Sequence, residues 1–331
     1  MTSRRTVLHA LAALIALLAF LFASPAAHSQ QPAKVFRIGV LSPGRDTKFV
    51  SHLVSQRLQE LGYIEGKHYS FERRFAEGNP ERLPELAAEL VRMNVDVILA
   101  YTNRSAFAAK SATRTIPIVV WGAHGALETG LVQSLARPGG NLTGMESLAP
   151  AADAKRMELL KEIVPGLSRV DVLYNPGDQG SQFHLSAAEA AGTALGVAIS
   201  TLEVRRPEDF DAALSSAAGK LPDAILTFTD TLTFQNSKRV AEFAVAKRVP
   251  TMCEFKDMVD AGCLISYGPS FTEFAEINAR QIARILAGDN PGEMPIERCT
   301  RFELVVNLKT ARAIGITIPK SVLLRADRVI E

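Results

Sequence analysis

From residue 35 onward, the chain alternates short apolar runs with longer stretches in which apolar residues recur every three or four positions. The short runs are rich in β-branched residues and predict strands, whereas the longer stretches predict amphipathic helices. Asn79 and Pro80 open one of these helices, because asparagine suits an N-cap and proline suits the first helical position. In the first half, the pattern predicts strands at 35–41, 69–75, 95–100 and 116–121 and helices at 49–61, 79–91 and 105–112.

A second round of the same alternation follows the small-residue stretch at residues 149–153. Its strands are nearly continuous in apolar residues, which is typical of parallel sheets covered by helices on both faces. We therefore expect an α/β fold with two doubly wound parallel sheets and right-handed crossovers. The second round predicts strands at 169–174, 197–204, 223–228, 250–255 and 264–267 and helices at 153–164, 181–195, 208–218, 234–248 and 271–286.

Residues 1–29 have the pattern of a secretory signal peptide. Arg4 and Arg5 precede an apolar run of about 13 residues, which is too short for a bilayer that needs about 20. The small residues that follow, ending in Ala27-His28-Ser29, fit a cleavage site. We expect cleavage near Ser29 and a mature protein in the periplasm. An uncleaved anchor helix is the alternative, and the twin-arginine and general export routes both stay open.

The charge balance and the length narrow the possible functions. The chain has 37 basic and 35 acidic residues, so the two counts become equal without Arg4 and Arg5. A neutral mature chain gives no electrostatic reason to bind nucleic acid. A chain of this length favours two domains over one. Three cysteines, Cys253, Cys263 and Cys299, match no metal-site spacing, and a disulfide between the first two stays open.

The sequence contains none of the common catalytic motifs. We find no G-x-S-x-G, no H-E-x-x-H, no phosphate loop and no G-x-G-x-x-G after the first strand. We therefore expect a binding protein with no catalytic residues, no cofactor and no bound metal. A secreted α/β enzyme is the alternative from another class.

Parallel sheets of this kind bind ligands beyond the carboxyl ends of their strands. Two such sheets predict a cleft that is lined by loops from both. Asp230 could accept hydrogen bonds from a ligand ammonium, although it could equally cap a helix. The amide groups near Ser181, at a helix start, would favour a carboxylate, and Trp121 could stack on a ring or pack in the core. The candidate ligand-binding residues are Ser42, Thr102, Asn103, Trp121 and His124 in the first lobe and Asn175, Asp178, Ser181, Thr229, Asp230 and Glu254 in the second.

Residues 130–144 carry a resemblance to a known protein family. They read Gly-Leu-Val-Gln-Ser-Leu-Ala-Arg-Pro-Gly-Gly-Asn-Leu-Thr-Gly, and this stretch resembles the solute-binding proteins of ABC-type importers in the TrpX-like group. We interpret Pro138 to Asn141 as a tight turn that uses the access of glycine to positive φ. Agreement with the group extends over nearly the whole mature chain, at residues 58–63, 86–91, 115–119, 302–312 and 325–331.

The resemblance implies the type I periplasmic binding fold, with a cleft between two lobes, a small-molecule ligand and a membrane permease as partner. We expect a monomer whose N-terminal lobe comprises residues 34–148 plus about 268–295. The C-terminal lobe then comprises residues 149–267 plus about 300–331, and the lobes close on the ligand about the crossovers. A sensory protein that serves a membrane receptor would share the same fold and cleft.

The chain departs from the group at one position of the cleft. Relatives often carry Asp-Pro shortly before the Gly-Leu-Val stretch, where this sequence has His124-Gly125. An imidazole in place of a carboxylate changes the ligand charge that the site tolerates. An amino-acid ligand, known for some relatives, therefore does not carry over directly.

Overall fold

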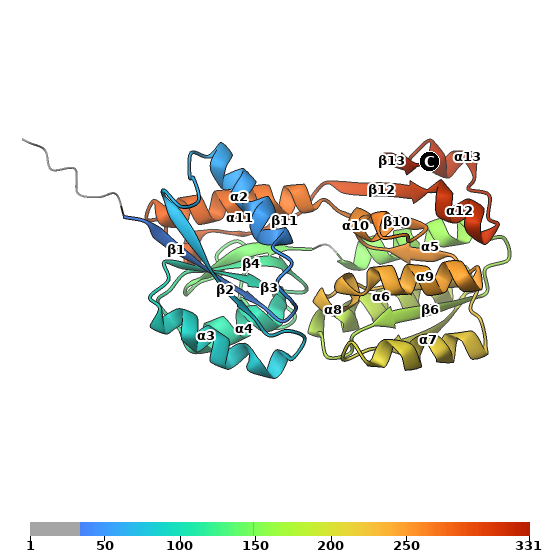
Figure 1. Cartoon of the computed structure of the whole chain (residues 1–331), viewed down its shortest axis with the longest axis horizontal. Coiled ribbons are helices and arrows are strands. Elements are labelled where there is room, and N and C mark those ends of the chain that lie inside the picture. The colour runs from blue at the N-terminus through green and yellow to red at the C-terminus, as the bar shows by residue number, and fades with distance from the viewer. Residues whose placement is uncertain (1–33, 148) are drawn as a thin grey trace, which may run out of the picture. The chain divides into compact units, whose positions relative to one another are not determined.

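The computed structural model describes residues 34–147 and 149–331, so the predicted signal peptide lies outside the described residues. Residues 35–331 contain two β-sheets, each with helices on both faces (Figure 1). The predicted α/β fold is therefore confirmed. None of the helices within the described residues is long and apolar enough to cross a membrane.

The first sheet has six strands, all paired in parallel, in the order β11-β5-β4-β3-β1-β2. Successive side chains point to opposite faces of a strand, so Val97 and Leu99 pack with the helices on one face and Ile98 and Ala100 with those on the other. The strands are β1 (Phe36–Ser42), β2 (Tyr69–Phe75), β3 (Val97–Tyr101), β4 (Ile118–Ala123), β5 (Leu142–Glu146) and β11 (Ile296–Arg298).

Two helices cover each face of the first sheet. On one face, α2 (Phe49–Glu60) packs against α11 (Phe271–Leu286), which also contacts β4 and β5. On the other, α3 (Leu83–Arg92) packs against α4 (Thr102–Ala112). A single 3-10 turn, η1 (Pro80–Arg82), precedes α3, and the Asn79 side chain accepts the Glu81 amide as its cap.

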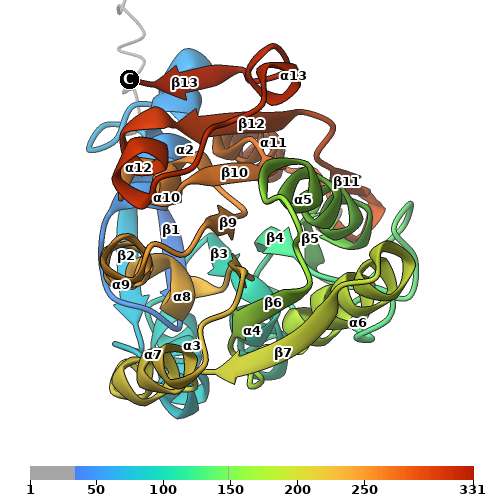
Figure 2. The same cartoon turned by 90° about the vertical axis from the view of Figure 1, so that its right-hand side faces the viewer.

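The second sheet has seven strands in the order β13-β12-β10-β9-β8-β6-β7. The strands are β6 (Arg169–Tyr174), β7 (Ala198–Glu203), β8 (Ala224–Thr227), β9 (Thr251–Cys253), β10 (Ile265–Pro269), β12 (Phe302–Asn307) and β13 (Arg328–Ile330). Figure 2 shows α5 and α6 on one side of the sheet and α7 and α9 on the other. The helices are α5 (Ala149–Ile163), α6 (Gln179–Leu195), α7 (Asp209–Gly219), α8 (Thr231–Gln235), α9 (Ser237–Lys247), α10 (Lys256–Asp260), α12 (Leu308–Ile314) and α13 (Lys320–Leu323).

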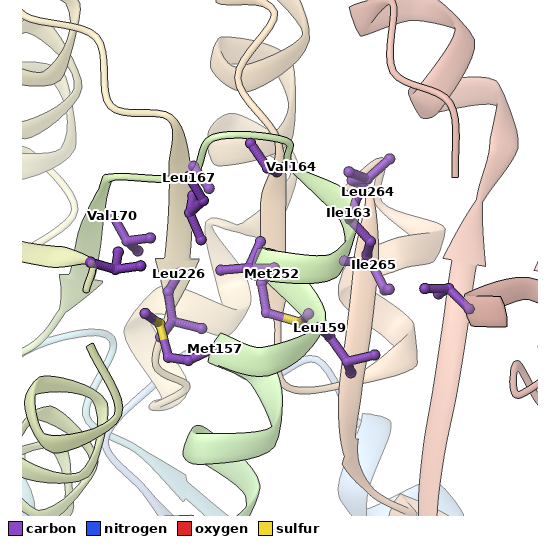
Figure 3. Packing of buried hydrophobic residues seen from close by; sticks show 14 of the residues in the cluster. Met157, Leu159, Ile163, Val164, Leu167, Val170, Leu226, Met252, Leu264 and Ile265 are labelled. Atoms are coloured by element: carbon purple, nitrogen blue, oxygen red, sulfur yellow. The ribbon is translucent and has the colours of Figure 1, made fainter. Parts of the chain in front are cut away.

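The main core of the second lobe lies between α5 and the sheet (Figure 3). Met157, Leu159 and Ile163 of α5 and Leu226 and Met252 of the strands are fully buried. Each side chain of this size contributes about 1.5–3 kcal/mol when it is removed from water. This packing fixes the position of α5, which carries two charged residues of the site described below.

One strand pair departs from the predicted parallel arrangement, since β10 and β12 run antiparallel. After β10 the chain enters α11, which packs in the first lobe, and then β11, which pairs with β5 of the first sheet. The chain returns to the second sheet from the same end at which it left, so β12 must run in the opposite direction. The residue limits of the two lobes stay a prediction.

Several predicted elements differ in extent from the structure. Residues 234–248 form two helices, α8 and α9, that meet at Asn236, and α4 begins at Thr102 and not at residue 105. No predicted element corresponds to strands β5, β11, β12 and β13 or to helices α10, α12 and α13. All are short, and short apolar runs carry little periodicity.

The Pro138–Asn141 turn is confirmed as a tight turn, with φ of 72° at Gly139 and 62° at Gly140. The Asn141 side chain donates to the carbonyl oxygens of Thr113 and Ile116 at 3.2 and 2.7 Å, which ties the turn to the start of β4. The three cysteines are free and buried, so the disulfide that the sequence left open is not formed.

Candidate ligand-binding cleft

The inner cavity lies where the strand ends of the two sheets meet, and its volume is about 110 Å³. Ser42 and Trp121 line it from the ends of β1 and β4, and Thr229 and Phe255 line it from the loops after β8 and β9. Both sheets thus face it with their carboxyl ends, as expected for ligand sites of such sheets. Its aromatic lining residues are Phe49, Tyr101, Trp121, Phe234, Phe255, Phe271 and Phe274.

These rings form one connected aromatic wall. Phe271 stacks on Phe255 with ring centroids 3.9 Å apart, and Trp121 meets Phe274 edge-on at 5.6 Å. Because α11 packs on the first sheet, Phe271 and Phe274 reach the cavity from the first lobe, whereas Phe255 belongs to the second. Such a wall offers both faces and edges of rings to a flat apolar ligand.

An outer cavity of about 70 Å³ adjoins the inner one and has a more polar lining. The two cavities share five lining residues, which are Arg45, Thr102, Asp230, Thr231 and Gln235. Arg104 and Arg205 add positive charge to the outer cavity. Arg205 pairs with Glu203 at 3.0 Å, but no carboxylate of the described residues forms an ion pair with Arg45 or Arg104.

Asp178 and Asp230, the two acids that line the outer cavity, both cap helices. Asp230 is the N-cap of α8, where Oδ1 accepts the Thr233 amide at 2.8 Å and Oδ2 accepts Asn175 Nδ2 at 2.6 Å. Asp178 caps α6 in the same way, accepting the Ser181 amide at 3.0 Å. Burial raises the pKa of Asp230, and the neighbouring Asp178 raises it further. Asp230 therefore has a hydrogen-bond partner on each carboxylate oxygen, whereas Asp178 uses only Oδ2 for its cap.

Thr102 holds an unusual position at the boundary of the two cavities. Its φ is 74°, a left-handed value that is strained for a β-branched residue. Its hydroxyl oxygen is buried and has no hydrogen-bond partner. Strain and an unpartnered polar atom together are common at binding sites.

The structure divides the predicted site residues into two groups. Those that line one or both cavities are Ser42, Thr102, Trp121, His124, Asn175, Asp178, Thr229 and Asp230. Asn103, Ser181 and Glu254 line neither of them. Asn103 holds the turn at His124 from behind, because its side chain donates to the His124 carbonyl oxygen at 2.7 Å and accepts the His124 amide at 3.0 Å. Direct ligand contact by any of these residues stays a prediction.

A chain of buried polar side chains lies behind His124, and the sequence did not predict it. His124 Nδ1 is 2.8 Å from His184 Nε2, and His184 Nδ1 is 2.7 Å from Asp153 Oδ2. Asp153 also pairs with Arg156, and an Arg156 nitrogen lies 3.5 Å from Glu254 Oε1. His124 belongs to the first lobe and the other four to the second, so the chain links the lobes.

The charges of this chain balance if His184 is protonated. Burial alone would raise the pKa of Asp153, but the His184 and Arg156 cations outweigh burial and hold it below its usual value. Burial alone would lower the pKa of His184, but Asp153 outweighs burial and raises it. Burial, and then the His184 cation, lower the pKa of His124. Two cations thus face the carboxylates of Asp153 and Glu254, as buried ions require.

The raised pKa of His184 predicts a pH dependence of stability. The unfolded-state pKa is about 6.5, so the contribution of this group is complete below about pH 6.5. It is lost as the pH rises through the higher folded-state pKa. We expect the stability advantage of the wild type over His184→Gln to shrink as the pH rises above about 6.5, as measured by urea unfolding. An exposed control, His52→Gln on α2, should keep the wild-type profile, and an advantage that grows with pH would contradict the assignment.

The arrangement does not form a catalytic triad. Asp153 and His184 have the geometry of an acid that orients an imidazole, but the next group is His124, where a hydrolase would place a hydroxyl or thiol. Burial raises the pKa of the Cys253 thiol, and burial together with Glu273 raises that of Cys299 to about 12. Within residues 34–147 and 149–331, no group of His, Cys, Asp and Glu is arranged to hold a metal ion.

The chain is similar in sequence and structure to several known proteins. The tyrosine-binding protein of Clostridioides difficile (strain R20291) is 24% identical over 257 residues, which cover 78% of this chain and 74% of that protein. A conserved domain protein from Vibrio cholerae O1 biovar El Tor superposes with a TM-score of 0.84 at 28% identity, covering 89% of this chain and all of that one. An ABC domain from Streptococcus pneumoniae in complex with L-Trp superposes with a TM-score of 0.83 at 24% identity, covering 90% of this chain and all of that one.

The family model for ABC transporter substrate binding proteins matches residues 40–330, which include both cavities and both sheets except for the start of β1. The match confirms the resemblance that residues 130–144 indicated. A cleft built from the strand ends of two α/β lobes suits a protein that binds a small molecule. The chain belongs to the family of ABC transporter substrate-binding proteins.

Proposed function

We propose that this protein captures a small organic molecule in the periplasm and delivers it to a membrane permease, as the solute-binding component of an ABC-type importer. The observation that carries the proposal is the inner cavity, whose walls come from both lobes. A ligand there contacts both lobes only when they lie against each other. Binding is thereby coupled to the arrangement of the lobes, which a permease can read.

Two direct contacts between the lobes support closure about the cleft. The Arg45 amide donates to Gln235 Oε1 at 3.2 Å, and Gln235 Nε2 donates to the Arg45 carbonyl oxygen at 3.0 Å. His124 and His184 form the second contact. These bonds join loops of the first lobe to α8 and α6 of the second. The chain also passes between the lobes after β5, between β10 and α11 and between β11 and β12, where a hinge can form.

The aromatic wall supports a ligand with a ring. The relatives point the same way, because one is a tyrosine-binding protein and another was solved with L-Trp. A ligand that binds with micromolar affinity supplies about 8 kcal/mol at the standard state, which is enough to favour the closed form strongly. We further propose that the mature protein begins near residue 30 and acts as a monomer.

A ligand screen on the refolded mature chain tests the proposal. The panel contains amino acids, aromatic acids, small amides and sugars. We expect one chemical class to raise the melting temperature, because a ligand at 100 times its Kd stabilises the folded state by about 2.7 kcal/mol. Small-angle scattering should then show a smaller radius of gyration with the saturating ligand.

A pair of matched variants locates the binding site. Phe271→Leu removes a stacked ring from the aromatic wall, whereas Phe107→Leu removes a ring from α4 that lines neither cavity. We expect weaker ligand binding only for Phe271→Leu. A panel without any stabilising compound, or a bound ligand that leaves the radius of gyration unchanged, would overturn the proposal.

A further inference from the structure

The distribution of charge in the cleft indicates which ligand groups it accepts. Arg45 lines both cavities, Arg104 lines the outer one, and neither is paired with a carboxylate of the described residues. Asp230 is the acid that lines both cavities, and each of its carboxylate oxygens already accepts a hydrogen bond within the protein. Asp178 lines only the outer cavity and caps α6 through Oδ2. Where the two cavities meet, an arginine without a carboxylate partner thus lies with an acid that is hydrogen-bonded on both oxygens, which favours an anionic group on the ligand.

The hydrogen-bond chain behind His124 fixes the proton on its ring. His184 must donate from Nδ1 to the Asp153 carboxylate, because a carboxylate only accepts. The buried cluster has balanced charge when His184 is a cation, and a cationic His184 also donates from Nε2. His124 Nδ1 lies 2.8 Å from that nitrogen and must accept the bond. The remaining proton of the neutral His124 ring therefore sits on Nε2, which has no partner among the described residues.

His124 lines the inner cavity, so this proton makes it a hydrogen-bond donor to whatever occupies the cavity. The unpartnered hydroxyl of Thr102, at the boundary of the two cavities, is a second available donor. A carboxylate accepts such bonds at each oxygen, and bonds to an ionised group are the stronger kind. An ammonium group can only donate, so it would gain no hydrogen bond from the His124 donor and would be repelled by Arg45.

The cavity size limits the rest of the ligand. The inner cavity of about 110 Å³ is of the same order as the apolar cavity of about 150 Å³ that admits benzene. It therefore suits one ring, which the aromatic wall contacts from both lobes. Resting on the proposed function, we infer that the protein selects small aryl carboxylates without an amino group, with His124 as a specificity-determining donor to the carboxylate.

Three compounds with the same ring and chain test this inference. L-Phenylalanine has a carboxylate and an ammonium, 3-phenylpropanoate has the carboxylate alone, and 2-phenylethylamine has the ammonium alone. By isothermal titration at pH 7.5, we expect 3-phenylpropanoate to bind at least about tenfold more tightly than either of the others, since a bond to an ionised group is worth a factor of this order. This ranking needs only the wild-type protein.

The variant His124→Asp replaces the donor with an acceptor. We expect it to bind 3-phenylpropanoate at least about tenfold more weakly than the wild type does. The preference for 3-phenylpropanoate over L-phenylalanine should then become smaller or reverse. The control is His52→Asp, the same substitution on the exposed side of α2 outside both cavities, which should keep the wild-type affinities.

Long-range proton–nitrogen NMR spectra of selectively labelled histidines test the donor directly. We expect both nitrogens of His184 and only Nε2 of His124 to be protonated at pH 7. A proton on His124 Nδ1 would overturn the inference.

The binding outcomes separate this inference from the proposed function. If L-phenylalanine or 2-phenylethylamine binds most tightly, the inference is overturned and the proposed function stands. If none of the three binds while another class from the screen does, the inference is again overturned and the proposed function stands. If no compound of the screen binds, both fail.

Discussion

Replacing Arg156 with methionine is expected to lower the free energy of unfolding by about 3–5 kcal/mol, which is the cost of leaving buried charges uncompensated. The Arg156 side chain is fully buried. It pairs with Asp153 and Glu254 and donates from Nε to the Tyr267 carbonyl oxygen at 2.7 Å. Methionine fills similar space but leaves two carboxylates facing one His184 cation. Urea unfolding of the purified mature chain measures the effect.

A second substitution separates loss of charge balance from loss of packing. In Arg156→Met/Glu254→Gln, one cation again faces one carboxylate, so we expect part of the lost stability to return. The matched control is Arg57→Met, which breaks an ion pair on the exposed side of α2 and should cost no more than about 1 kcal/mol. If Arg156→Met were as stable as the wild type, the cluster would not hold two ionised carboxylates.

Gly180→Ala is expected to weaken ligand binding by about tenfold or more, because it makes the closed form less populated. A Cβ atom on Gly180 would lie 2.4 Å from His124 Cβ and 2.8 Å from His124 Cγ. Gly180 is the second residue of α6 in the second lobe, and His124 belongs to the first. The extra methyl group therefore obstructs the contact between the lobes and leaves each lobe intact. Isothermal titration and small-angle scattering with saturating ligand measure the two effects.

The position of Gly180 makes this a test of closure and not of folding. Alanine is the better helix former, so α6 should be slightly more stable in the variant. Gly219→Ala, at the end of α7, adds a methyl group that meets no atom within 4 Å and serves as the control. Unchanged affinity and unchanged compaction in Gly180→Ala would show that ligand binding does not need the His124 turn to approach α6.

Much of the fold was predictable because its signals are local. The periodicity of apolar residues depends on neighbours a few positions apart, so it located most helices and strands and indicated two parallel sheets. It missed β5, α10, β11, α12, α13 and β13, which are too short for a period to show. It also missed the antiparallel β12, because the direction of that strand depends on the path of the chain through α11 and β11 in the first lobe.

The candidate site was predictable to the level of loops. Parallel strands bring their carboxyl ends to one edge of the sheet, so Ser42, Trp121 and Thr229 could be placed at the cleft by counting along the chain. The hydrogen-bond partners of each polar side chain were not predictable in the same way. Asp178 and Asp230 follow apolar strands in similar settings to other cleft residues, yet each uses one carboxylate oxygen to cap a helix, α6 and α8 respectively.

The buried cluster of His124, His184, Asp153, Arg156 and Glu254 is only weakly indicated by the sequence. Asp153 and Arg156 are spaced so that they lie on one face of a helix, on which Leu160 and Ile163 are also buried. Charged residues among apolar positions of a helix indicate a buried pair, and this signal could have been found. His184 gave no comparable signal, because a single polar residue in a helix is ordinary.

The sequence by itself determined the export signal pattern, the two α/β lobes, the family and the edge of the sheets at which the two cavities lie. These follow from local periodicity and from motifs that lie within a few residues of each other. Only the tertiary structure decided that His124 meets His184, 60 residues further along the chain, and that the charges behind them balance. That contact joins two lobes, and its proton positions depend on Asp153, Arg156 and Glu254, which long-range packing brings together.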